Sequence, residues 1–199
     1  QQVEHFSHPG MTANDSFKPV TKYFDRITRP EQIIQSLPQA IQTMLDPADT
    51  GPACLSLCQD VQGEIFDYPE EFFKERIHNI SRPKPDDFQI KQAMEKIKKS
   101  KKQIIISGGG VFYSDAMDEL GSFAIKHNIP VTQTVMGYST MKRDHSHFLG
   151  PIGGLGGRAA NTLAKETDLA ICVGTKLADF TTGSWANFEN PEFKLVSIN

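Results

Sequence analysis

The clearest pattern of apolar and polar positions begins at residue 103. Residues 103–106, QIII, are mostly β-branched and lie between lysines and glycines, so we expect a buried strand. Three glycines follow, and apolar side chains then recur at spacings of three and four between Ser114, a candidate helix cap, and Asn128, which suits a left-handed helix stop. A second extended run covers residues 129–134. This order predicts a βαβ unit, which belongs to a parallel sheet with helices on both faces.

The same reasoning extends the α/β pattern along the chain. Further buried strands are predicted at residues 52–57 and 168–173, and a last strand is predicted at residues 193–198. Helices are predicted at residues 30–45, after the pair Asp86-Asp87, and at residues 158–165. Pro38 lies inside the first of these helices, where a proline costs about 3 kcal/mol or produces a kink.

Three segments lack such periodicity. Residues 67–88 are rich in charge and proline, which is typical of a linker between domains. Residues 135–157 are polar and glycine-rich, so we expect a long loop there. Residues 175–188 show no clear period, and Trp185 within them is most simply a packing anchor.

Composition narrows the classes of function. Of the 199 residues, 38% are hydrophobic, as in ordinary globular proteins, and the net charge of -3 arises from 21 basic and 24 acidic residues scattered along the chain. No basic stripe for nucleic acid and no apolar run long enough to span a membrane is present, so we expect neither partner and a cytoplasmic location. The cysteines, Cys54, Cys58 and Cys172, are odd in number and are expected to be reduced.

Two glycine clusters are candidate anion or nucleotide sites. One follows the strand at residues 103–106, where open α/β sheets bind ligands, and the other precedes the helix that starts at Arg158. The first contains Gly108, Gly109 and Gly110, and the second contains Gly150, Gly153, Gly154, Gly156 and Gly157. Neither matches a dinucleotide or P-loop fingerprint. The alternative is that these glycines only form tight turns.

Other combinations of reactive side chains give no site. His145 and His147 beside Asp144 could ligate a metal, but no further ligands lie nearby in the sequence, so a solvated loop is the preferred interpretation. Cys54 and Cys58 also lack further metal ligands nearby in the sequence, so a zinc site there is not expected. No nucleophile elbow and no local set of nucleophile, base and acid occurs. We therefore assign no catalytic and no metal-binding residue.

Several segments together resemble the thiamine-diphosphate-dependent enzymes of the acetolactate synthase and pyruvate oxidase superfamily. They are GPACLSLCQDVQGE, KKQIIISGGGVFYSDAMDEL, NIPVTQTVMGYSTM, FLGPIGGLGGRAANTLAKETDLAICVGTKLADFTTG and FKLVSIN. Within that superfamily, residues 14–33 and 59–73 are most similar to the branch that opens the ring of an inosose-derived diketone in myo-inositol catabolism. The resemblance covers nearly all 199 residues.

The resemblance implies that the chain is a fragment with three parts. Residues 1–66 correspond to the end of a pyrimidine-binding domain, residues 67–88 to a linker, and residues 89–199 to a Rossmann-like middle domain truncated before its last strands. The intact enzyme is expected to use thiamine diphosphate and Mg²⁺ for carbon–carbon cleavage and to be a homo-oligomer. The family's Gly-Asp-Gly motif is absent here, so the fragment itself is expected to be structural, inactive and unable to bind these cofactors.

Two alternative functions stay open, a free-standing nucleotide-binding module and a carboligase, and the resemblance also bears on flavin binding. Some relatives bind FAD or ADP on the middle domain, but the flavin-binding members carry an arginine where this chain has Phe180 after Asp179, which makes flavin binding unexpected. The glycine clusters would also suit a free-standing module that binds ADP, FAD or NAD. The intact enzyme could instead be a carboligase similar to acetolactate synthase.

Overall fold

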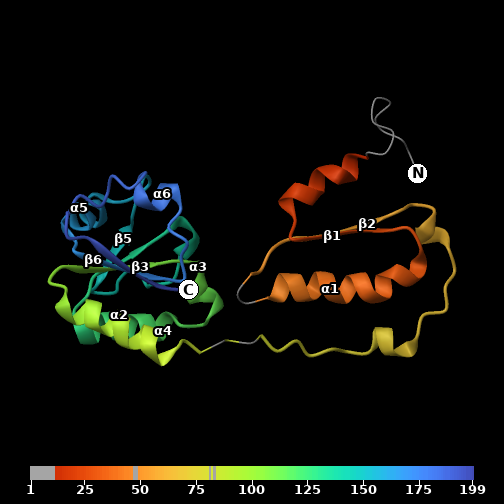
Figure 1. Ribbon diagram of the computed structural model, residues 1–199, viewed down its shortest axis with the longest axis horizontal. Helices are drawn as coiled ribbons and strands as arrows, with labels where there is room; N and C mark the ends of the chain where they lie inside the picture. The colour runs from red at the N-terminus through yellow and green to blue at the C-terminus, as the bar shows by residue number, and fades with distance from the viewer. Residues whose placement is uncertain (1–11, 47–48, 81, 83) are drawn as a thin grey trace. The chain divides into compact units, whose positions relative to one another are not determined.

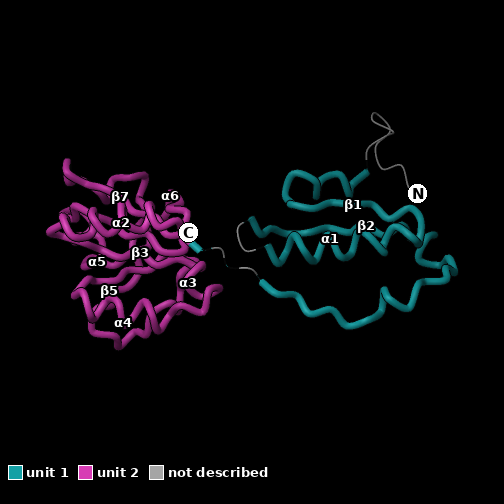
Figure 2. The backbone as a smooth tube through the Cα atoms, turned by 60° about the horizontal axis from the view of Figure 1, so that its bottom comes forward, with its two compact units in different colours: residues 1–84 teal, residues 85–199 magenta. Residues whose placement is uncertain are grey.

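A computed structural model describes residues 12–46, 49–80, 82 and 84–199 of the chain. The chain forms two compact units, Gln1–Lys84 and Pro85–Asn199, shown in separate colours in Figure 2. The boundary between the units falls within residues 67–88, the segment expected to be a linker. Each unit has its own sheet and is described by itself.

The first unit is built on a two-stranded parallel sheet. Strand β1 (Tyr23–Ile27) pairs with β2 (Ala53–Leu57), and helix α1 (Ile33–Leu45) connects them (Figure 1). A 3₁₀ helix, η1 (Ala13–Val20), precedes β1, and a 3₁₀ turn, η2 (Pro30–Gln32), leads into α1 as the proline at residue 30 predicted. Helix α1 continues through Pro38, so the predicted helix forms in spite of this proline.

An aromatic cluster follows the sheet of the first unit. It lies around two 3₁₀ turns, η3 (Val61–Gly63) and η4 (Glu70–Phe73), and its rings have centroids 4.9 to 6.0 Å apart. The cluster consists of Phe66, Tyr68, Phe72 and Phe73. The hydroxyl of Tyr68 donates a hydrogen bond to the carbonyl of Pro30 at 3.2 Å, which ties the first part of the predicted linker to η2.

The second unit contains five parallel strands in the order β5-β4-β3-β6-β7. The strands are β3 (Gln103–Ser107), β4 (Val131–Gln133), β5 (Phe148–Pro151), β6 (Leu169–Val173) and β7 (Lys194–Ile198). Parallel pairing of β3 with β4, with Ile105 opposite Val131, confirms the predicted βαβ unit. The expectation of a loop throughout residues 135–157 was wrong, because β5 and the 3₁₀ turn η5 (Val135–Gly137) form there.

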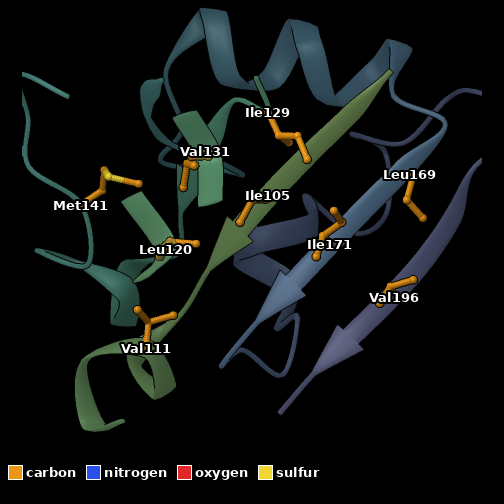
Figure 3. Close-up of a cluster of buried hydrophobic side chains, with 10 residues drawn as sticks. Ile105, Val111, Leu120, Ile129, Val131, Met141, Leu169, Ile171 and Val196 are labelled. Atoms are coloured by element: carbon orange, nitrogen blue, oxygen red, sulfur yellow. The ribbon is translucent and has the colours of Figure 1, made fainter. Parts of the chain in front are cut away.

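Helices cover both faces of this sheet, as predicted. Figure 1 shows α2 (Asp87–Lys99) and α4 (Met117–His127) on one face, with α5 (Arg158–Glu166) and α6 (Asp179–Thr182) on the other. Side chains alternate along β3, so Ile105 packs in one apolar cluster while Ile104 and Ile106 pack in the other. Figure 3 shows the first cluster, in which β3, β6 and β7 contribute Ile105, Ile171 and Val196.

The helix predicted to start at Ser114 begins elsewhere. A short helix, α3 (Gly109–Tyr113), starts within the glycines, and Ser114 closes it by donating its N–H to the carbonyl of Gly110. Helix α4 then starts at Met117, so the assignment of Ser114 as its cap was wrong. Asn128 ends α4 with φ of 52°, which confirms the predicted left-handed stop. None of the described helices is long and apolar enough to cross a membrane.

Candidate functional site

Both glycine clusters lie at the carboxyl edge of the five-stranded sheet. All five strands are parallel, so the segments that follow them start at the same edge. Strand β4 lies on one side of β3 and β6 lies on the other, so the direction in which strands are added reverses at β3. Open α/β sheets bind ligands at such a reversal, which here lies at the carboxyl ends of β3 and β6. This point is where a candidate site would lie.

At this point the first cluster packs against the loop after β6. The N–H of Gly108 donates to the carbonyl of Val173 at 2.8 Å, and the N–H of Gly110 donates to the carbonyl of Gly174 at 2.9 Å. A Cβ on Gly108 would overlap the carbonyl oxygen of Gly174, and one on Gly110 would lie 2.6 Å from the Cα of Gly174. These glycines therefore permit a close contact between two backbones, and two of their amides are already used.

The second cluster is also held by internal hydrogen bonds. The amides of Gly154, Gly156 and Gly157 donate to the carbonyls of Phe180, Gly153 and Pro151 at 2.8 to 2.9 Å. The N–H of Gly153 donates to Oδ1 of Asn161 at 2.9 Å, and the Nδ2 of Asn161 donates back to the carbonyl of Gly153 at 3.0 Å. An anion would have to compete with these acceptors, so binding of a phosphate by the cluster stays a prediction.

Asn161 is a residue that the sequence reasoning missed. Its side chain makes two hydrogen bonds to the backbone of Gly153, whose φ of +96° is unfavourable for other residues. The Nδ2 of Asn187, from the segment after α6, also lies 3.5 Å from Oδ1 of Asn161. An asparagine in the second turn of a helix that follows a glycine loop was the available signal, because asparagine has a low helix propensity.

The two loop histidines bind neighbouring polar groups. Nε2 of His147 lies 3.0 Å from Oδ1 of Asn128, and its Nδ1 lies 2.9 Å from Oγ of Ser146. Nδ1 of His145 accepts the backbone N–H of His147 at 3.2 Å. Within the described part of the chain, no three His, Cys, Asp or Glu side chains gather as a metal site. The described side chains therefore offer no ligand set that fits a Mg²⁺-diphosphate group.

Two titratable groups of the second unit, Cys172 and Asp168, have shifted pKa values. Burial raises the pKa of the Cys172 thiol to about 12, so this cysteine is not an activated nucleophile. Burial also raises the pKa of Asp168, but hydrogen bonds from Ser100 and from the amides of Lys101 and Lys102 lower it more, and the net pKa lies below its usual value. Asp168 precedes β6 at the amino edge, opposite the glycine clusters.

The segment after β6 carries the residues that bear on flavin binding. Asp179 begins α6, and its Oδ1 accepts a hydrogen bond from the hydroxyl of Ser184 at 2.9 Å. The ring of Phe180 is exposed, while its carbonyl accepts the N–H of Gly154. The position expected to hold an arginine in flavin-binding relatives therefore offers an apolar ring, and the absence of flavin binding stays a prediction.

Comparison with known proteins places this fold in a class of cofactor-dependent enzymes. The family model for the central domain of thiamine pyrophosphate enzymes matches residues 90–199, which is almost all of the second unit. The chain therefore belongs to that family. Its structure is also similar to that of a protein from Mycobacterium smegmatis described as a thiamin diphosphate-dependent enzyme, with a TM-score of 0.71 and 21% identity over 99% of this chain and 38% of that one.

More similar sequences are found among curated proteins. The chain is 49% identical over its full 199 residues to the 3D-(3,5/4)-trihydroxycyclohexane-1,2-dione hydrolase of Clostridium perfringens strain 13. It is 45% identical over the same length to the 3D-(3,5/4)-trihydroxycyclohexane-1,2-dione hydrolase 1 of Bacillus cereus strain ZK. In both comparisons the chain spans 31% of the relative's length.

Proposed function

We propose that these 199 residues are part of a thiamine-diphosphate-dependent hydrolase that opens the ring of a trihydroxycyclohexane-1,2-dione by carbon–carbon cleavage, in the breakdown of myo-inositol. The observation that carries the proposal is 49% identity to a hydrolase of that name over the whole chain. The similarity includes the first unit, which lies outside the residues matched by the central-domain model. It therefore indicates this particular branch in addition to the general family.

The role proposed for the chain within that enzyme is structural. The 199 residues contain no Gly-Asp-Gly sequence, and the described side chains form no acidic cluster for Mg²⁺. We assign thiamine diphosphate and Mg²⁺ to the remaining domains of the longer protein. In this assignment residues 1–66 end the pyrimidine-binding domain, residues 67–88 form a linker, and residues 89–199 supply a middle-domain scaffold. Homo-oligomerisation, a cytoplasmic location and the absence of FAD stay predictions from the sequence.

The test compares ring opening by the full-length protein with ring opening by the 199-residue chain. We expect the full-length protein to consume the trihydroxycyclohexane-1,2-dione only when thiamine diphosphate and Mg²⁺ are present, and the chain to be inactive. Mass spectrometry of the products would separate hydrolysis from carboligation. Formation of acetolactate from pyruvate without ring opening would contradict the proposal and favour the carboligase.

A free-standing nucleotide-binding module is the second candidate function. It is favoured by the position of Gly108–Gly110 at the carboxyl end of β3, where open α/β sheets bind ligands. Titration of the chain with ADP, FAD and NAD tests this candidate. Saturable binding of any of the three would support it, and no heat with any of them would dismiss it.

A further inference from the structure

The first unit contains a pocket between α1 and the segment that follows η4. Its volume is about 230 Å³, below the roughly 300 to 1,000 Å³ of sites for drug-sized ligands, so it suits a small molecule. Figures 1 and 2 both show the segment after η4 running along α1. The residues that line the pocket all lie between positions 37 and 78, and therefore within one unit.

The floor of the pocket is apolar. Leu37, Pro38 and Ile41 line it at helical spacings of three and four, so they lie on one face of α1, and each is partly buried. Phe72 of η4 adds an aromatic ring, which stacks on Tyr68 with the ring centroids 5.6 Å apart. The hydroxyl of Tyr68 is bonded to η2, just before α1. The floor is therefore formed by the fold itself, before any ligand binds.

Pro38 breaks a rule of helix formation at this pocket. Inside a helix a proline removes one backbone hydrogen bond and costs about 3 kcal/mol, yet α1 continues through it. Residues that break such local rules are expected mainly at functional sites. The place of Pro38 in the pocket lining gives it a use that the stability of α1 does not, because its ring is a rigid apolar surface.

The wall that faces α1 is cationic. Lys74, Arg76 and His78 line the pocket. The lining does not include Glu75 and Ile77, which lie between them, and Ile77 is 85% exposed. In a segment that only crosses a surface, the apolar residue would face the protein and the cations would face water. The reversed arrangement indicates a wall that meets a negative charge.

This wall carries one permanent positive charge without a partner. Nζ of Lys74 lies 2.9 Å from Oε1 of Glu71, so the charge of Lys74 is already paired. Among the described residues, no acidic side chain pairs with Arg76, and none of the lining residues is acidic. A guanidinium binds a carboxylate through two parallel hydrogen bonds. One unpaired charge therefore suits a carboxylate better than a doubly charged phosphate ester.

We propose that this pocket binds a small organic carboxylate. The carboxylate pairs with Arg76 and accepts a further hydrogen bond from the imidazole of His78. The apolar body of the ligand packs on Leu37, Ile41 and Phe72. The glycine clusters lie in the other unit, so this site is separate from them, and it does not depend on the ring-opening reaction.

Isothermal titration of the full-length protein with phenylacetate tests the proposal without any substitution. Acetate keeps the carboxylate but lacks the apolar body, and phenylacetamide keeps the body but lacks the charge. We expect saturable binding of phenylacetate and at least about ten-fold weaker binding of both comparison molecules. Equal affinities for phenylacetate and phenylacetamide would overturn the proposal. So would the absence of saturable phenylacetate binding, because the stems of the cations would then only cover α1, or another part of the polypeptide would fill the pocket.

Two substitutions that remove the same charge locate the binding. Arg76→Gln changes an exposed side chain of the pocket and should weaken phenylacetate binding about ten-fold, with no effect on phenylacetamide. Lys84→Gln, at an exposed position of the same unit outside the pocket, is the control and should leave both affinities unchanged. An equal loss in the two variants would indicate general attraction of anions, and an unchanged affinity in Arg76→Gln would place the binding elsewhere. Either result would overturn the proposal.

Discussion

Oδ2 of Asp168 accepts a hydrogen bond from the backbone N–H of Lys101 at 2.8 Å, across 67 residues of sequence. Its other oxygen accepts from the hydroxyl of Ser100 and from the N–H of Lys102. One carboxylate just before β6 therefore accepts the hydrogen bonds of the turn between α2 and β3. Strand β3 is the first of the five strands in the sequence and the central one in the sheet. This relationship fixes the amino edge of the sheet, opposite the candidate site.

Asp168→Asn should destabilise the second unit. The substitution removes the charge that strengthens three hydrogen bonds, so we expect the free energy of unfolding to fall by about 1 to 3 kcal/mol at neutral pH. Urea unfolding followed by circular dichroism would measure the change. Asp144→Asn, an exposed aspartate in a loop of the same unit, is the control and should leave the transition midpoint unchanged.

The stabilisation by Asp168 should depend on pH in one direction. The pKa of Asp168 is lowered in the folded protein, so its contribution is complete above the unfolded pKa, about 3.9, and is lost as pH falls through the folded pKa. The difference in unfolding free energy between the wild type and Asp168→Asn should therefore be constant near neutral pH and shrink below about pH 4. A difference that grows as the pH falls would contradict this assignment.

The hydrogen bonds of Asn161 should rigidify the second glycine cluster. Asn161→Ala leaves the N–H of Gly153 without its acceptor and removes one of the two donors to the carbonyl of Gly153, which should cost about 1 to 3 kcal/mol. Hydrogen–deuterium exchange of residues 153–157 should become faster. Thr162→Ala, at the next and exposed position of α5, is the matched control. Unchanged exchange in Asn161→Ala would show that the loop does not depend on this side chain.

The close contact of Gly110 with Gly174 should make the first glycine cluster intolerant of side chains. A Cβ at Gly110 would lie 2.6 Å from the Cα of Gly174, so Gly110→Ala should force the loops apart and cost about 1 to 3 kcal/mol or more. No atom lies within 4 Å of a Cβ at Gly157, and serine is a favourable residue at a helix N-terminus. Gly157→Ser should therefore be neutral or stabilising, as thermal unfolding would show.

The three cysteines should differ in their reactivity. Cys172 is fully buried with its pKa raised to about 12, whereas Cys54 and Cys58 are partly exposed. Iodoacetamide at mildly alkaline pH should alkylate Cys54 and Cys58 in the folded protein and Cys172 only after denaturation, because the reactive species is the thiolate. Peptide mass spectrometry would locate the modified residues. Alkylation of Cys172 at the rate of Cys54 would show that the cluster around β6 opens readily.

The sequence predicts the sheet of the second unit better than its edge elements. The strand at residues 103–106 and the stop at Asn128 follow from local rules, because a short β-branched run and an asparagine at a helix end have few alternatives. Strand β5 was missed because its sequence, FLGP, contains a glycine and a proline. Pro151 is tolerated there because β5 is an edge strand, where a missing N–H need not break the ladder.

The candidate site is harder to predict from sequence. The position of both glycine clusters at the carboxyl edge follows from their place after parallel strands. The acceptors of their amides do not, because Phe180, Asn161 and Gly174 lie in segments whose approach depends on the whole sheet. Helix α3 starts earlier than the helix predicted at Ser114, and this start also depends on a contact with a distant strand. Gly108 is held extended beside Val173, so a helix can begin at the next residue.

Isothermal titration with thiamine diphosphate and Mg²⁺, carried out on both the 199-residue chain and the full-length protein, tests the central claim most directly. The claim is that the chain is a scaffold within a thiamine-diphosphate enzyme whose cofactor site lies in other domains. It predicts saturable binding by the full-length protein and no heat of binding by the chain. Saturable micromolar binding by the chain, or no binding by the full-length protein, would contradict it.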